Sequence, residues 1–339
     1  MNPIEAMTTT LVNENTSTQA FADDVRRGMA TDPKYLLSRY FYDAAGDLLF
    51  QKIMNLPEYY LTRCEFEIFQ KHWQAIFSEL NGAPFDLIEL GAGDGLKTQV
   101  LMEAFLNEKA DFRYLPIDIS GSVLDMLRET LWERWPELPV IPVEGEYFSA
   151  LREIDRLSDR RKLVLFLGSN IGNMQEEQAA DFLSQLRQRM HPGDLLLVGF
   201  DLKKDPEVIL AAYHDAQGVT KAFNLNLLHR INRELGADFN LAAFRHWPVY
   251  NPLTGDMKSY LVSEKEQTVR IEALDLEVAF RKWEAVDMEL SKKYDRSEIA
   301  WLAEHAGFEA KQWFFDENEY FVDVLLGANQ ERKIQNNER

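Results

Sequence analysis

A glycine-rich turn near residue 90 is the segment of this 339-residue chain best suited to hold a ligand. Residues 89–95 read Glu-Leu-Gly-Ala-Gly-Asp-Gly and follow the apolar run 85–90. Glycine lacks a Cβ atom, so its backbone can turn tightly and approach a ligand closely. At the carboxyl end of the first strand of a doubly wound sheet, such a turn binds nucleotides. The pattern alone fits NAD, FAD or S-adenosylmethionine.

Asp118 is the second residue with a chemical role, because it ends the next apolar run, 112–117. A carboxylate in this place can accept hydrogen bonds from the hydroxyls of an adenosine ribose. A strand-terminal aspartate can also cap the turn that follows it, so a structural role stays open. Together with Gly91 and Gly93, Asp118 indicates a nucleoside cofactor, without choosing between a hydride donor and a methyl donor.

Another polar turn, Gly-Ser-Asn-Ile-Gly-Asn over 168–173, follows the apolar run 163–167. The carboxyl ends of parallel strands meet at one edge of the sheet, so we expect Gly168 and Asn173 near the glycine turn. Asn173 could hydrogen-bond a substrate carboxylate or amine. It could equally be the N-cap of the next helix.

Two features favour a methyl donor over a hydride donor. The third glycine, Gly95, comes one residue earlier than in the dinucleotide fingerprint, and Lys97 stands near the start of the helix. The chain also ends in a helical pattern at 297–306 and two strand patterns, 308–315 and 320–326, joined by a turn. This ending, with an antiparallel last strand, resembles class I S-adenosylmethionine-dependent methyltransferases.

The elements around these residues alternate between short apolar runs and helical patterns, which predicts a buried, doubly wound parallel sheet of the α/β class. Thr62 and Glu65 have the spacing of a capping box that opens a helix to about residue 80. The predicted strands are 85–90, 112–117, 163–167 and 194–200, with a weaker strand at 138–143 that Pro139 and Pro142 interrupt. The helices between them are 96–106, 120–134 and 175–190.

The alternation stops after residue 203 and returns only near residue 297. Between them lie a helical stretch at 206–235 and several strand patterns. We therefore predict a core of 65–203 and 293–327, and an inserted α+β substrate-binding lobe of 19–64 and 204–292. The polar ends, 1–18 and 328–339, are expected to be flexible.

Composition narrows the class of partner. The net charge of −19 disfavours nucleic acid and anionic membranes, so a small-molecule substrate fits better. The single cysteine, Cys64, excludes an internal disulfide, and the histidines lack metal-ligand spacing. No apolar run approaches the ~20 residues of a membrane span, and the N-terminus lacks signal-peptide character. We expect a cytoplasmic monomer without a metal.

Seven ordered motifs make the resemblance more specific. The chain resembles the L-histidine N-alpha-methyltransferases of ergothioneine biosynthesis, a family that is also similar to dimethylallyltryptophan N-methyltransferases. The motifs extend over most of the chain. They are Tyr42-Asp43 with Gly46 and Phe50, and the segments 56–63, 89–91, 116–120, 168–173, 223–236 and 289–294.

The resemblance implies an enzyme that uses S-adenosylmethionine to trimethylate the α-amine of L-histidine, giving hercynine. The residues it implies for the S-adenosylmethionine site are Gly91, Gly93, Lys97, Asp118, Glu146 and Tyr147. Those it implies for the amino acid are Gly168, Asn173 and Tyr213 toward the carboxylate, and Tyr59, Glu289 and Ser291 around the imidazole. Tyr42 and Asn173 are the implied catalytic residues.

The departures from the family pattern are modest. The family often has Asp-Phe where this chain has Glu146-Tyr147, and Thr where it has Asn170. The second change could reshape the substrate end of the pocket.

Glu289 gives the histidine assignment its chemical sense. A carboxylate can accept the imidazole N–H, and a site built for such a bond rejects analogues without it by ~10⁴–10⁵ in good cases. Taken alone, Glu289 and Ser291 would fit a solvated helix start, and Tyr59 would fit a core position.

Several readings stay open at this point. The same fold could methylate a tryptophan-like amino acid, or serve as a regulator that binds S-adenosylmethionine without turnover, and a nicotinamide dehydrogenase is a more distant option. The amine must reach the methyl donor unprotonated, with its proton lost to water or passed toward a tyrosine. An aromatic face such as that of Tyr42 could favour the growing ammonium cation.

Overall fold

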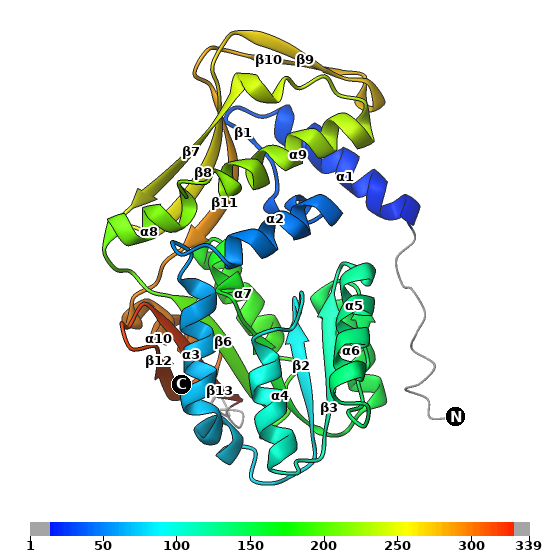
Figure 1. Cartoon of the computed structure of the whole chain (residues 1–339), viewed down its shortest axis with the longest axis vertical. Helices are drawn as coiled ribbons and strands as arrows, with labels where there is room; N and C mark the ends of the chain where they lie inside the picture. The colour runs from blue at the N-terminus through cyan, green and yellow to red at the C-terminus, as the bar shows by residue number, and fades with distance from the viewer. Residues whose placement is uncertain (1–13, 329–339) are drawn as a thin grey trace, which may run out of the picture. The chain divides into compact units, whose positions relative to one another are not determined.

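The computed structural model describes residues 14–328, and they fall into two compact units (Figure 1). Unit 1 comprises Cys64–Leu202 and residues 294–328. Unit 2 comprises residues 14–63 and Lys203–Lys293. Both units are therefore built from two separate stretches of the chain.

Unit 1 is built on a seven-stranded sheet with the order β12-β13-β6-β5-β2-β3-β4. The five strands from β6 to β4 are parallel, whereas β13 runs antiparallel to both β6 and β12. This confirms the predicted fold class, a doubly wound α/β sheet that ends in an antiparallel hairpin. The strands are β2 (Phe85–Leu90), β3 (Phe112–Asp118), β4 (Val143–Glu144), β5 (Arg161–Phe166), β6 (Leu195–Asp201), β12 (Phe308–Phe315) and β13 (Phe321–Ala328).

Helices cover both faces of this sheet (Figure 1), which is why its central strands are apolar at successive positions. On one face, side chains of α6 (Tyr147–Leu157), α7 (Glu176–Arg187) and α10 (Arg296–His305) pack against Ile88, Val164 and their neighbours. On the other face, Phe77 and Phe105 stack together and Phe105 contacts Phe85. The helices on that face are α3 (Leu61–Ser78), α4 (Thr98–Asn107) and α5 (Gly121–Arg134).

Three local predictions are wrong. The strand expected at 138–143 is reduced to Val143–Glu144, because Pro139 and Pro142 cannot donate to a strand ladder. Helix α3 already begins at Leu61, so Thr62 is not its N-cap. The helix expected at 206–235 is broken into α8 (Pro206–Tyr213) and α9 (Val219–Leu235) by a turn that contains Gly218 at φ +73°.

The chain leaves unit 1 and returns to it at neighbouring points. Leu202 and Tyr294 form a parallel bridge, and the Tyr294 N–H donates to the Asp201 carbonyl over 2.9 Å. The 91 residues Lys203–Lys293 are thus an insertion whose ends are anchored side by side in the sheet of unit 1.

Unit 2 contains a four-stranded sheet of order β1-β11-β8-β7 and a β9-β10 hairpin. Helices α8 and α9 lie against β7 and β8, and α2 packs on α9. The strands are β1 (Lys34–Tyr35), β7 (Phe244–Asn251), β8 (Asp256–Ser263), β9 (Gln267–Ile271), β10 (Leu276–Phe280) and β11 (Ala285–Lys292). The remaining helices are α1 (Glu14–Met29) and α2 (Ala44–Met54), with the 3₁₀ turns η2 (Ser38–Phe41), η4 (Leu241–Ala243) and η5 (Glu272–Leu274).

Within residues 14–328, no helix combines the length and the apolar character that a membrane span requires. In the same part of the chain, His, Cys, Asp and Glu side chains form no cluster of three that could hold a metal ion.

Candidate functional site

The glycine turn after β2 has the backbone conformation that favours glycine. Gly91, Gly93 and Gly95 have φ values of +74°, +53° and +61°. A Cβ atom on Gly91 would lie 2.9 Å from the Tyr147 hydroxyl, and one on Gly95 would lie 2.7 Å from a Leu127 methyl group. A Cβ on Gly93 would meet no protein atom within 4 Å. The turn is therefore closed by protein at Gly91 and Gly95 and open at Gly93.

Asp118 is tied to this turn by its carboxylate. The Gly93 N–H donates to Oδ2 over 3.1 Å and the Ser120 N–H donates to Oδ1 over 3.0 Å. Burial raises the pKa of Asp118, and these backbone hydrogen bonds act in the opposite direction. The structure thus brings Asp118 and the glycine turn together at the carboxyl ends of β2 and β3.

Tyr147 is the first residue of helix α6, which follows β4, and its hydroxyl lies against Gly91 of the glycine turn. Its ring packs edge-on against Phe166, with 5.9 Å between the ring centroids. Burial raises the pKa of Tyr147, and the neighbouring Asp118 charge adds to that rise. Glu146 occupies the N-cap position of α6, but its exposed side chain makes no capping hydrogen bond. Its carboxylate therefore remains available to a ligand.

Lys97 has a partner that the sequence did not reveal. Its ammonium pairs with the carboxylate of Glu65, which is fully buried in α3. The Gly168 N–H donates to the same carboxylate over 2.8 Å, so Glu65 links Lys97 to the turn after β5. Burial would lower the pKa of Lys97, but the Glu65 charge and hydrogen bond raise it. Lys97 is therefore held as a cation beside Gly168.

Asp323 adds a second buried carboxyl group to this cluster. It lies in β13 opposite Gly199, where a Cβ atom would come within 2.4 Å of Glu65 Oε1. Burial first, and then the Glu65 charge, raise the pKa of Asp323 well above its ordinary value, and Lys97 acts in the opposite direction. Asp323 is therefore a buried carboxyl group whose neutral form is favoured beside Glu65.

The two asparagines of the turn after β5, Asn170 and Asn173, have different surroundings. Asn173 ends the 3₁₀ helix η3 (Asn170–Asn173) with an exposed side chain, and the N-cap of α7 is Gln175. The helix-cap role considered for Asn173 is therefore wrong. Asn170, where the chain departs from the family pattern, has its Nδ2 atom 3.4 Å from the position of a Gly91 Cβ. Asn170 thus faces the glycine turn.

In unit 2, a β-bulge determines which side chains of β11 face the interior. Val286 pairs with Leu261 of β8, but past the bulge Glu289 pairs with Ser259 and Ser291 with Met257. Leu261, Ser259 and Met257 form the buried face of β8. The one-residue shift therefore moves Glu289 and Ser291 onto that face. Glu289 lies in a strand, so the solvated helix start considered for it is wrong.

Polar groups gather around this part of β11. The hydroxyl of Tyr213, the last residue of α8, donates to Ser291 Oγ over 2.7 Å. The buried Lys293 ammonium donates to Tyr213 Oη over 2.8 Å and to Ser291 Oγ over 2.9 Å. Burial raises the pKa of Glu289 to about 7, and the Lys293 charge acts in the opposite direction. The predicted residues Tyr213, Glu289 and Ser291 therefore share one environment.

Tyr42 and Tyr59 belong to an aromatic cluster of the same unit. The Phe50 ring lies 5.5 Å from Tyr42 and 6.3 Å from Tyr59, measured between centroids, and Phe223 contacts Tyr42 and Phe50. The Arg63 guanidinium donates to the carbonyls of Leu56, Pro57 and Tyr59, which fixes the backbone that carries Tyr59. Tyr59 is buried, while Tyr42 is partly exposed.

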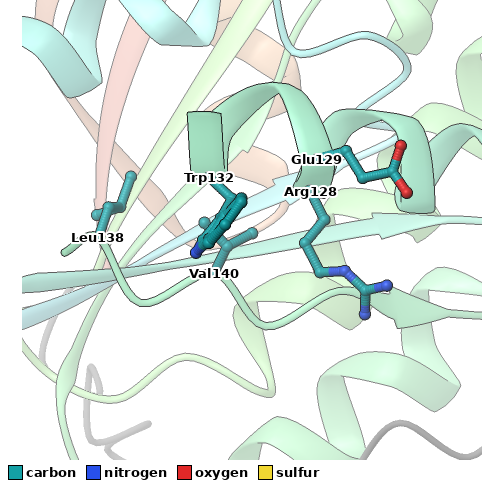
Figure 2. A pocket seen from close by; sticks show the side chains of 5 residues that line it. All are labelled: Arg128, Glu129, Trp132, Leu138 and Val140. Atoms are coloured by element: carbon teal, nitrogen blue, oxygen red, sulfur yellow. The ribbon is translucent and has the colours of Figure 1, made fainter. Parts of the chain in front are cut away.

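A surface pocket of unit 1 lies beside α5 (Figure 2). In Figure 2 the ring of Trp132, which is 68% exposed, lies next to Val140. None of the predicted site residues lines this pocket, which is formed by Arg128, Glu129, Trp132, Leu138 and Val140. It is thus separate from the glycine turn.

Replacing Gly91 by alanine is expected to weaken S-adenosylmethionine binding at least tenfold. The new methyl group would displace the Tyr147 hydroxyl, and the left-handed backbone adds about 1–2 kcal/mol of strain. Isothermal titration calorimetry measures the affinity. Gly82→Ala is the control, since Gly82 has a similar φ of +67° but no protein atom near its Cβ position. Equal losses in both variants would contradict the assigned role of Gly91.

Comparison with known proteins places these observations in a family. The model of a family described as histidine-specific, S-adenosylmethionine-dependent methyltransferases matches residues 21–328. The histidine N-alpha-methyltransferase of Mycolicibacterium smegmatis is 38% identical over 314 residues, which cover 91% of this chain and 96% of that protein. The match thus extends through both units.

More distant relatives share shorter or weaker similarity. Ergothioneine biosynthesis protein 1 of Schizosaccharomyces pombe is 32% identical over 69% of this chain and 31% of that protein. The L-tryptophan methyltransferase of Psilocybe serbica is 27% identical over 87% of this chain and 88% of that protein.

Proposed function

Because the chain belongs to the histidine-specific, S-adenosylmethionine-dependent methyltransferase family, we propose that unit 1 binds the methyl donor and that unit 2 carries the side chains that hold the imidazole ring. The enzyme transfers methyl groups from S-adenosylmethionine to the α-amine of L-histidine, a step toward ergothioneine. We further propose three successive transfers, with the trimethylated betaine hercynine as the product.

The observation that carries the histidine assignment is the β-bulge of β11. It turns Glu289 and Ser291 toward the interior, beside Tyr213 and Lys293. A partly buried carboxylate with a raised pKa is costly to the fold, so its presence there supports a binding role. Imidazole offers the N–H that this carboxylate can accept, and a phenyl ring does not.

On the donor side, the residues of unit 1 fit S-adenosylmethionine. Asp118 would accept the ribose hydroxyls, Gly93 leaves the turn open, and the Lys97 ammonium would hold the ligand's carboxylate. Glu146 and Tyr147 complete this set. Once bound, S-adenosylmethionine supplies a methyl group that its sulfonium already makes electrophilic.

On the acceptor side, the protein must orient the substrate amine toward that methyl group. Such positioning can contribute ~7–11 kcal/mol to catalysis. Asn173 and Gly168 would bind the carboxylate end of histidine, and Glu289, Ser291 and Tyr59 would hold its ring. Tyr213, whose hydroxyl proton is donated to Ser291 Oγ, would orient Ser291. The Tyr42 face would stabilise the cation as methyl groups accumulate.

Mass spectrometry tests the proposal directly. Purified protein is incubated with S-adenosylmethionine and a mixture of amino acids, and the products are identified by mass. We expect histidine to gain three methyl groups on its α-nitrogen. Methylation of tryptophan in place of histidine would reject the substrate assignment, and accumulation of a monomethyl product would reject the trimethylation.

The affinity for histidine is expected to rise with pH. Because the pKa of Glu289 is about 7, its ionised fraction grows about tenfold between pH 6 and pH 8, and only the ionised form accepts the imidazole N–H well. Calorimetry with S-adenosylhomocysteine present measures binding without turnover. Glu289→Gln should keep only the smaller change caused by titration of the imidazole itself. An unchanged pH profile in this variant would show that Glu289 is not the titrating group.

We also propose a cytoplasmic monomer. The single cysteine, Cys64, is buried and forms no disulfide, as in proteins of reducing compartments. The net charge of −19 opposes association between copies. Size-exclusion chromatography with light scattering tests the oligomeric state.

A further inference from the structure

Lys293 is a buried lysine that contacts Tyr213 and Ser291, two residues of the proposed histidine site. It follows β11 directly, and its side chain has no exposed surface. Its ammonium donates to Tyr213 Oη and Ser291 Oγ and lies 4.6 Å from the centroid of the Tyr213 ring. Burying an ammonium is costly unless it is paired or hydrogen-bonded, and Lys293 donates to both hydroxyls. The number of hydrogen bonds at Ser291 indicates the role of Lys293.

A serine hydroxyl has one proton to donate and two lone pairs that accept. Ser291 Oγ accepts from the Tyr213 hydroxyl over 2.7 Å and from the Lys293 ammonium over 2.9 Å. Both lone pairs are then occupied, so Ser291 can make another hydrogen bond only as a donor. Among residues 14–328, no hydrogen bond uses the Ser291 proton, and the side chain lies on the same strand face as Glu289.

We propose that Lys293 is a positioning residue that fixes Ser291 as a hydrogen-bond donor, so that Ser291 and the acceptor Glu289 together select a neutral imidazole ring. This inference rests on the proposed function, in which these two residues hold the ring. Neutral imidazole has one N–H for Glu289 and one bare nitrogen for Ser291. An indole offers an N–H but no bare nitrogen, and an imidazolium offers two N–H groups.

The Lys293 charge acts on the second member of this pair as well. It opposes the effect of burial on Glu289, and so favours the ionised carboxylate that accepts the imidazole N–H. Lys293 thereby supports both the donor and the acceptor of the ring.

A double-mutant cycle tests the proposal. The variants Lys293→Met, Ser291→Ala and their combination are compared with wild type for kcat, KM and kcat/KM toward histidine. Each single change should raise KM about tenfold, the effect of one hydrogen bond, with S-adenosylmethionine affinity unchanged. The cycle is measured at pH 9, where Glu289 is ionised, so that Lys293 acts on the ring only through Ser291. The combined variant should then be little worse than either single variant. Additive losses of about a hundredfold would overturn the proposal.

A substrate without ring nitrogens separates positioning from general damage. Turnover of 3-(2-thienyl)-L-alanine, although slow, should be the same in wild type, Lys293→Met and Ser291→Ala. A parallel loss with this substrate would mean that Lys293 is merely structural. Lys162→Met is the matched control, since Lys162 is a buried lysine in β5 of unit 1, and its loss should leave the KM for histidine unchanged.

The outcomes also distinguish this inference from the proposed function. If Ser291→Ala leaves the KM for histidine unchanged, the assigned histidine site is wrong. If Ser291→Ala raises the KM for histidine but Lys293→Met does not, only the role of Lys293 is wrong.

Should Lys293→Met fail to fold, Lys293→Gln replaces it, because the amide can donate to both oxygens. At pH 9, where Glu289 is ionised, this variant should stay within about threefold of wild type, and a tenfold loss would overturn the proposal.

Discussion

Replacing Glu289 by alanine is expected to lower kcat/KM for histidine by about 10²–10³-fold, while the affinity for S-adenosylmethionine stays within about twofold. The substrate N–H would lose its charged acceptor and face an apolar methyl group. Steady-state kinetics with histidine and calorimetry with S-adenosylmethionine separate the two effects. If kcat/KM for histidine and the affinity for S-adenosylmethionine fell together, the fold would be damaged and the assigned role of Glu289 in histidine binding would be contradicted.

Asp287 provides the matched control for Glu289. It is an acidic residue of the same strand, but it precedes the bulge and pairs with Tyr260 on the other face of the sheet. Its carboxylate accepts a hydrogen bond from the Lys258 ammonium over 2.7 Å, and the Asp287 side chain is 31% exposed. Asp287→Ala should therefore change histidine turnover less than about threefold, as expected for a partly exposed ion pair. An equal loss in both variants would show that the bulge does not select the functional carboxylate.

Replacing Glu289 by glutamine should also stabilise the fold at alkaline pH. The folded-state pKa of Glu289, about 7, lies above its ordinary value of 4.5, so the folded protein holds this proton more tightly than the unfolded chain. The resulting stability is complete at low pH and is lost as pH rises through 4.5 to 7, by up to about 3 kcal/mol. Glu289→Gln should thus raise the melting temperature at pH 8 and not at pH 4.

Replacing Lys97 by methionine is expected to cost both stability and S-adenosylmethionine binding. The fully buried Glu65 would lose its charged partner, and breaking such a pair typically costs about 3–5 kcal/mol. Asp323, beside Glu65, would add repulsion if it ionised. Loss of the charged contact to the ligand carboxylate should weaken S-adenosylmethionine about 10–100-fold. Urea denaturation and calorimetry measure the two effects.

A second substitution distinguishes the two roles of Lys97. Combining Lys97→Met with Glu65→Gln removes the unpaired buried charge, so most of the stability should return. The affinity for S-adenosylmethionine should remain low, because the ammonium is still missing. If affinity recovered together with stability, Lys97 would serve only to neutralise Glu65.

Local patterns in the sequence predicted most of the strands and helices of unit 1. The run Phe85–Leu90 is β2, and the glycine turn and Asp118 follow their strands as predicted. These features depend on residues that are neighbours in the chain. The failures, such as the strand at 138–143, arose where prolines removed the donors that the apolar pattern requires.

Long-range contacts account for what the sequence did not reveal about the candidate site. Glu65 fitted a capping box, yet its carboxylate pairs with a lysine 32 residues away, and Asp323 gave no signal beyond its strand. The bulge in β11 depends on pairing with β8, so the apolar pattern of the strand alone could not place Glu289. Lys293 belonged to a matched motif, but only its hydrogen bonds suggest a role.

The adjacent anchoring of Leu202 and Tyr294 has an evolutionary consequence. Because the inserted segment begins and ends at one bridged pair, residues can be gained, lost or exchanged inside it without altering the spacing of the sheet strands. A histidine and a tryptophan methyltransferase both match this chain, over 91% and 87% of its length, and such an insertion is a segment in which substrate contacts can differ.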